Sequence, residues 1–184
     1  MRRMVVALAL ALVACGGEEL EPMDAYESAE LQARAYNFQI FPGARFLEEQ
    51  TEALRRAHFV LQPDAIEAPP MAMYEADAPL EEVARFYAGK YRYGTVAEND
   101  VNDFSSVRPP AYYTAGDLAA DAAGIRPIVQ KLGFDLTLAR YQGPWRGAHI
   151  AARESLPRVT LQRPYIDVVN DRVVDKTLIL LVRE

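Results

Sequence analysis

Apolar residues recur along this chain at two different spacings, and the spacing predicts the type of each element. Short runs rich in β-branched and aromatic residues, some alternating with polar ones, are bounded by turn formers, which is typical of β-strands. We therefore expect strands at residues 36–41, 71–76, 134–141, 147–153, 158–168 and 177–182. Pro164 interrupts the fifth run, and because proline donates no ladder hydrogen bond, it predicts an edge, a bulge or a break there.

Helical spacing marks three other segments. Residues 51–61 place Leu54, Ala57, His58 and Leu61 on one face. Residues 79–91 begin with proline and two nearby glutamates, which suit the start of a helix, and they carry a wide apolar face. Residues 117–132 predict a third helix, in two pieces because Gly124 and Pro127 interrupt it.

The segment between the second and third helices, residues 93–116, is rich in Asn, Asp, Ser and Pro and predicts a long irregular loop. Residues 169–176 predict the connection of a C-terminal hairpin. The connections between the last strands are too short for parallel crossovers. The order of elements therefore predicts an α+β fold: an antiparallel sheet, built mainly from C-terminal strands, with helices packed on one face.

The first fifteen residues follow none of these patterns. The basic start Met1–Arg3 precedes eleven apolar residues from Met4 to Ala14, and Cys15, the only cysteine, follows them. The sequence Leu12-Val13-Ala14-Cys15, with the charge and apolar core before it, resembles the signal peptide and lipobox of bacterial lipoproteins. The resemblance implies cleavage before Cys15 and diacylation of its thiol. In lipoproteins of enteric type, Gly16 after the cysteine implies sorting to the outer membrane.

Two alternatives to a lipoprotein signal are a membrane-spanning helix and an ordinary signal peptide. A spanning helix needs about 20 apolar residues, whereas eleven fit the apolar region of a signal peptide, which is about 7–15 residues long. An ordinary signal cut elsewhere would leave an unpaired cysteine in an oxidising compartment. We expect three parts: a signal peptide at 1–14, the lipidated cysteine and an acidic tether at 15–35, and one α+β domain at 36–184.

The net charge of −6 becomes −8 once Arg2 and Arg3 are removed. Residues 18–87 contain fifteen acidic and five basic side chains, whereas residues 126–163 contain two acidic and seven basic ones. This asymmetry marks either a partner-binding surface or two segments that pair within the fold. An acidic exported chain without clustered lysine and arginine does not predict a nucleic-acid partner.

A second resemblance covers a minority of the domain. The sequence Phe41-Pro42-Gly43-Ala44 and the segment 74–87, YEADAPLEEVARFY, are similar to a pattern in small exported bacterial domains, many of them uncharacterised. Those domains have a proline-glycine turn, a strand ending in Asp/Ala/Pro and a helix of the type E-E-V-x-x-F-Y. The resemblance implies a β–α unit and adds no catalytic residue.

Catalytic and metal-binding motifs are absent from the sequence. It has two histidines, His58 and His149, and no H-E-x-x-H, G-x-S-x-G, cysteine cluster or phosphate-binding glycine loop. His58 falls on the apolar face of its helix, which favours a core or boundary position. We expect no metal and no cofactor, and a non-enzymatic protein is favoured, with an enzyme left open.

Two stretches combine arginine with aromatic residues, which are enriched where proteins bind partners. The candidate contacts are Arg108, Tyr112 and Tyr113 in the first stretch, and Trp145, Arg146 and His149 in the second. The same side chains could instead cover an open end of the core, and both interpretations stand. We expect one of Tyr112 and Tyr113 to be buried and the other exposed.

The sequence thus predicts an envelope lipoprotein, attached to the membrane through Cys15, that binds or assembles with another envelope protein. The alternative is a small-molecule-binding protein or hydrolase that uses a pocket near the 93–116 loop and His149.

Overall fold

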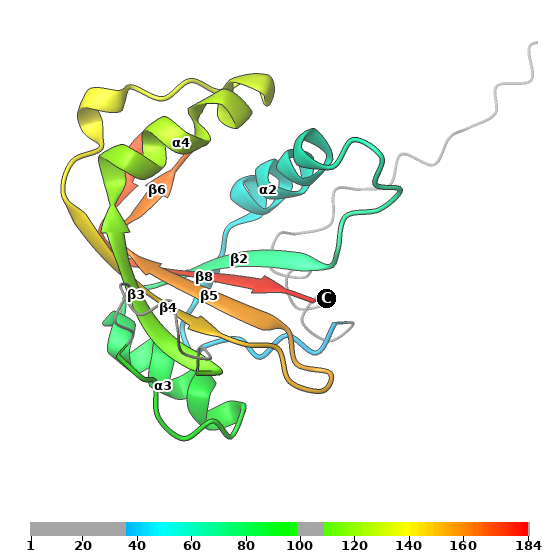
Figure 1. Ribbon diagram of the computed structural model, residues 1–184, viewed down its shortest axis with the longest axis vertical. Coiled ribbons are helices and arrows are strands. Elements are labelled where there is room, and N and C mark those ends of the chain that lie inside the picture. Colours follow the sequence, from blue (N-terminus) through cyan, green and yellow to red (C-terminus); the bar gives the residue numbers. More distant parts are fainter. Residues whose placement is uncertain (1–35, 99–108, 184) are drawn as a thin grey trace, which may run out of the picture.

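The computed structural model describes residues 36–98 and 109–183. A single antiparallel sheet of six strands runs through the middle of the molecule in the order β1-β2-β8-β5-β4-β3 (Figure 1). The strands are β1 (Arg45–Phe46), β2 (Met71–Ala76), β3 (Ala111–Asp117), β4 (Pro144–Ile150), β5 (Arg158–Arg163) and β8 (Thr177–Val182). A separate hairpin consists of β6 (Tyr165–Asp167) and β7 (Arg172–Val174). The predicted α+β class and the antiparallel sheet are confirmed.

Helix α3 (Leu80–Lys90) packs on one face of this sheet. Glu81 and Glu82 occupy its first turn and Lys90 its last, so negative charge lies at the positive end of the helix dipole and positive charge at the negative end. Its buried face meets the side chains of four strands: Ala72, Tyr74, Ala148, Ile150, Val159, Leu161, Ile179 and Leu181. The predicted helix at 79–91 and its packing on an antiparallel sheet are therefore confirmed.

Helices α2 (Glu48–Leu61) and α4 (Leu118–Lys131) lie on the opposite face, with the β6–β7 hairpin beside α4 (Figure 1). The prediction of helices on one face therefore describes only part of the arrangement. The reason lies in β8, whose sequence TLILLV is apolar on both faces, as expected of a strand covered on both sides. Ile179 and Leu181 meet α3, and the alternating Leu178 and Leu180 face the other way.

Asp117 begins α4 by accepting a hydrogen bond from the backbone N–H of Ala120 at 3.0 Å, a common way to satisfy a free donor at a helix start. The helix then continues through Gly124 and Pro127, so the prediction of two pieces was wrong. Both residues are exposed, while Leu118, Ala122 and Val129 are buried around them. Burial of one apolar face therefore outweighs the local preference for a break.

Three further predictions were wrong at the level of single elements. Residues 36–41 form no strand. Asn37 has a φ of 55°, which is left-handed backbone, and Phe38 and Phe41 are buried in the core from an irregular segment. Residues 134–141 contain only the short 3-10 helix Leu138–Arg140. The predicted irregular segment 93–116 includes most of β3, which pairs along its whole length with β4.

The loop at residues 134–141 is held by the turn of the β6–β7 hairpin. The Asp171 carboxylate accepts hydrogen bonds from the hydroxyl of Thr137 at 2.7 Å, its N–H at 2.8 Å, Tyr141 at 2.7 Å and Arg140 at 2.7 Å. These donors, Thr137 foremost, lower the pKa of Asp171 to about 2. These hydrogen bonds to Asp171 thus replace the ladder that a strand would have formed here.

Pro164 separates β5 from β6 at the other end of the hairpin. Of the three predicted alternatives, an edge, a bulge or a break, the break is therefore observed.

A buried carboxylate ties the hairpin to the main sheet. Glu75 on β2 has a side chain 6% exposed, and it accepts hydrogen bonds from Arg45 at 2.8 Å, Lys176 at 2.9 Å and Tyr165 at 2.8 Å. Burial alone would raise the pKa of Glu75, but these three donors outweigh burial and lower the pKa to about 2. The network therefore joins β1, β2, β6 and the residue that precedes β8 through one negative charge.

Candidate functional site

The candidate residues from the sequence do not form one cluster. Arg108 and Cys15 lie outside the described residues. Tyr112 and Tyr113 are both half-buried, so the prediction of one buried and one exposed tyrosine was wrong. Successive strand residues point to opposite faces of a sheet, and β3 therefore directs these two tyrosines to opposite sides.

Tyr112 and His149 are cross-strand neighbours. They are paired in the register of β3 and β4, and their rings lie 5.3 Å apart. The Oγ1 of Thr160 on β5 lies 3.3 Å from Nδ1 of His149. The row continues through Leu180 on β8 to Met73 on β2, and all five side chains are partly exposed. This row lies on the face of the sheet that carries α2 and α4.

Tyr113 and Arg146 lie together on the opposite face, where α3 packs. The guanidinium of Arg146 is 5.3 Å from the Tyr113 ring centre, and it pairs with Glu81 at 2.8 Å and with Glu98 at 3.6 Å. Burial, with the nearby carboxylates of Glu81 and Glu98, raises the pKa of Tyr113. Trp145 points the other way and packs against the cluster around Leu118. A role of these residues in contacting a partner stays a prediction.

An apolar slot that no sequence pattern predicted lies between α2 and α4. Its volume is about 250 Å³. Its walls consist of eleven apolar side chains and one amide: Gln50, Ala53, Leu54, Ala57 and Leu61 from α2, Met73 from β2, Ile125, Ile128, Val129 and Leu132 from the α4 region, and Ile166 and Val168 from the hairpin region. Apolar enclosure with few polar groups is typical of ligand pockets. The periodicity of residues 51–61 identified the apolar face of α2, but not the gap beside it.

The slot has one closed and one open end along α2. At the closed end Gln50 is buried, and its side-chain amide donates a hydrogen bond to Asp167 at 3.0 Å. At the open end Leu61 is 62% exposed. Phe59 and Ile66 on either side of Leu61 in the chain are 42% and 95% exposed, and these three are the large apolar side chains most exposed among the described residues. Phe59 is two residues from Leu61 and therefore lies on the opposite side of α2 from the slot. We call Leu61 and Ile66 the apolar mouth.

Asp167 holds one wall of the slot in place. Its carboxylate also accepts hydrogen bonds from the side chains of Asn170 at 2.9 Å and Arg172 at 3.0 Å. Burial alone would raise the pKa of Asp167, but the bonds from Gln50, Asn170 and Arg172 lower it overall. The hairpin is thereby fixed against α2, which positions Ile166 and Val168 in the slot wall.

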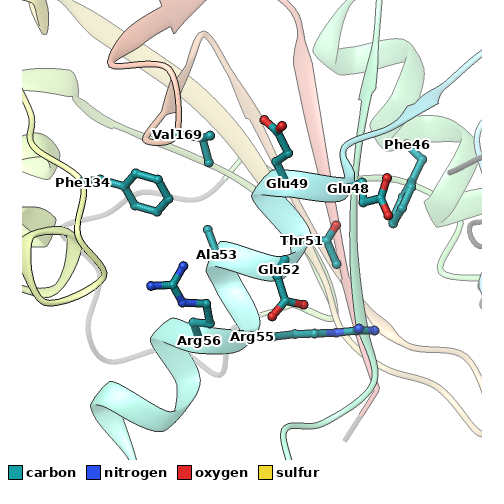
Figure 2. Close-up of a pocket in the computed structure, with 10 residues that line it drawn as sticks. All are labelled: Phe46, Glu48, Glu49, Thr51, Glu52, Ala53, Arg55, Arg56, Phe134 and Val169. Carbon is teal, nitrogen blue, oxygen red and sulfur yellow. The ribbon is translucent and has the colours of Figure 1, made fainter. Parts of the chain in front are cut away.

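A second, polar groove of about 530 Å³ runs along the other side of α2 (Figure 2). Arg56 and Phe134 lie at one end of it and Glu48 and Phe46 at the other. Arg56 donates a hydrogen bond to the carbonyl of Leu132 at 2.6 Å and lies 6.0 Å from the Phe134 ring centre, so it also closes the gap between α2 and α4. Three glutamates line the groove, yet no group of acidic or histidine side chains among the described residues could hold a metal ion.

His58 lies near the end of α2, half-buried and edge-on to Phe59, with 5.6 Å between the ring centres. This is the boundary position that its spacing predicted.

Among residues 36–98 and 109–183, no helix is both long enough and apolar enough to cross a membrane. Comparison of the chain with protein families, with curated proteins and with solved structures finds no significant match. Function is therefore inferred from the sequence and structure of this chain.

Proposed function

We propose that the protein is a lipid-anchored lipoprotein of the bacterial envelope, attached to the membrane through Cys15. The support is in the sequence: a basic start, eleven apolar residues and the lipobox Leu12-Val13-Ala14-Cys15. One acyl chain binds a membrane only marginally, so the two or more chains of a bacterial lipoprotein are what stable attachment requires. Gly16 favours the outer membrane where the organism has one.

The domain, in this proposal, is a non-enzymatic binding module whose site is the apolar slot. The observation that carries the proposal is the continuity of the slot with the apolar mouth through Leu61, which belongs to both. An enclosed, mainly apolar pocket that opens to solvent is the usual form of a ligand-binding site. A small-molecule-binding protein or hydrolase that uses His149 stays a prediction.

Two experiments in cells test the two parts of the proposal. Cys15→Ser should abolish incorporation of an alkyne fatty acid, and equal labelling of variant and wild type would refute the anchor. A photoreactive p-benzoylphenylalanine at position 61 should give a covalent adduct in the membrane fraction. The same group at position 82, on exposed Glu82 of α3, is the matched control, and equal adducts at both positions would refute the binding site.

A further inference from the structure

The dimensions of the slot restrict what can enter it. Gln50 and Leu61 are the first and last residues of α2 that line the slot, and eleven helical rises of about 1.5 Å separate them by about 16 Å. A volume of about 250 Å³ distributed along this length describes a long, narrow slot rather than a rounded cavity. An unbranched, flexible chain matches this shape.

A helix from a partner protein does not fit inside. An α-helix with its side chains is about 10–12 Å across, which is too wide for a slot of about 250 Å³ whose lining extends along α2 from Gln50 to Leu61. A polar small molecule is also unsuited, because Gln50 is the one polar side chain of the lining and already donates to Asp167. An extended acyl chain needs width for one carbon chain and no hydrogen bonds.

We propose that the slot holds one acyl chain of a zwitterionic phospholipid, an inference that rests on the proposed binding function. The chain enters past Leu61 and extends toward Gln50. The headgroup and the second chain remain outside, where the apolar mouth offers exposed Ile66 to the second chain.

Charge at the mouth distinguishes between lipid classes. Asp64 and Glu67, both exposed, flank Ile66 in the turn that follows α2. Two carboxylates there repel the free carboxylate of a fatty acid and attract the ammonium group of a phosphatidylcholine or phosphatidylethanolamine. A zwitterionic headgroup is therefore favoured over an anionic one.

The test uses the mature chain from Gly16 onward, produced without its lipid, which retains every described residue. It is incubated with phosphatidylcholine vesicles containing a radiolabelled phosphatidylcholine, and the vesicles are then removed by sedimentation. We expect about one phospholipid to remain in solution per protein chain. Ala57→Trp, which fills the slot, should lower this uptake at least about tenfold. Ala123→Trp, on an exposed alanine of α4 that does not line the slot, should change it less than about twofold.

Each other outcome contradicts a specific step. Uptake that Ala57→Trp leaves unchanged, while circular dichroism shows the variant folded, would place the lipid elsewhere. Dodecanoate that binds while phosphatidylcholine does not would identify a free fatty acid and overturn the headgroup assignment. A protein rather than a lipid in the adduct at position 61 would overturn the acyl inference and keep the proposed binding function. Absence of both uptake and adduct would overturn both.

Discussion

Glu75 provides the sharpest test of the electrostatics of this fold. Its carboxylate meets two cations whose own side chains are 65% exposed for Arg45 and 41% exposed for Lys176. Ion pairs of this exposure contribute up to about 1 kcal/mol each. The hydrogen bond from the buried Tyr165 hydroxyl contributes more, because a bond to a charged acceptor is worth about 1.5–3 kcal/mol, against about 0.5–1.5 kcal/mol for a neutral one.

Glu75→Gln keeps the shape of the side chain and an acceptor for Tyr165 but removes the charge. We expect it to lower the free energy of unfolding at pH 7 by about 2 kcal/mol. The folded pKa of about 2 lies below the ordinary value of 4.5, so the wild type has this stability above the ordinary pKa. It loses the stability as the pH falls toward 2. The difference between wild type and variant should therefore shrink across that range.

Urea unfolding monitored by circular dichroism at a series of pH values measures this difference. Glu82→Gln on the exposed surface of α3 is the control, and it should stay within about 0.5 kcal/mol of the wild type. A Glu75→Gln variant as stable as the wild type at pH 7 would refute the reasoning. So would a deficit that stays constant as the pH falls.

Four other substitutions test the anchor of the 134–141 loop and the packing. Asp171→Asn should speed amide hydrogen exchange in the 134–141 loop at neutral pH, and this difference should vanish as the pH falls toward the pKa of about 2. Gly116→Ala should destabilise by about 1–3 kcal/mol, because a Cβ there overlaps the Trp145 ring. At Gly124 a Cβ meets open space and the backbone is helical, so Gly124→Ala should stabilise by about 0.5–1 kcal/mol. Equal melting temperatures for Gly116→Ala and Gly124→Ala would contradict this expected difference. Phe86→Ala should cost about 2 kcal/mol in a urea titration, less than the 3–5 of a fully buried ring, since Phe86 is half-buried; a cost near zero would mean that its ring does not pack.

The strands at the centre of the sheet could be predicted to the residue. Met71–Ala76 and Thr177–Val182 are short, largely apolar runs, and the structure begins and ends β2 and β8 at those residues. Neighbouring strands cover both edges of each, so local pattern and tertiary environment agree. The helix at 79–91 was also predictable, because its apolar face in the sequence is the face that packs on the sheet.

Residues 36–41 and 134–141 contain buried apolar residues but pair with no strand. Their conformation could not be predicted from the alternation of apolar and polar residues. Phe38 and Phe41 contribute to the core, but alternation in sequence does not show whether the backbone will find a partner strand. Residues 134–141 alternate like a strand, yet Asp171, more than thirty residues away in the sequence, binds their backbone. In both places a distant contact decides the conformation.

The candidate site shows the same division. The apolar face of α2 follows from the spacing of Leu54, Ala57 and Leu61, and one helix alone suffices to see it. The slot depends on how α2 is placed against α4 and the hairpin. Arg56 bonds the carbonyl of Leu132 at the end of α4, and Gln50 bonds Asp167 of the hairpin, so distant residues fix that placement. No pattern within one segment of sequence contains that information.

The central claim is that a defined slot about 16 Å long binds one hydrocarbon chain. The most direct measurement is the affinity of the lipid-free mature chain for alkyl phosphocholines of eight to sixteen carbons, titrated below their micelle concentrations. Each methylene that enters the slot should strengthen binding about fourfold. Bonds of about 1.5 Å advance a zigzag chain about 1.25 Å per carbon, so the gain should stop near thirteen carbons. Affinity that continues to rise through sixteen carbons, or that ignores chain length, would contradict the slot.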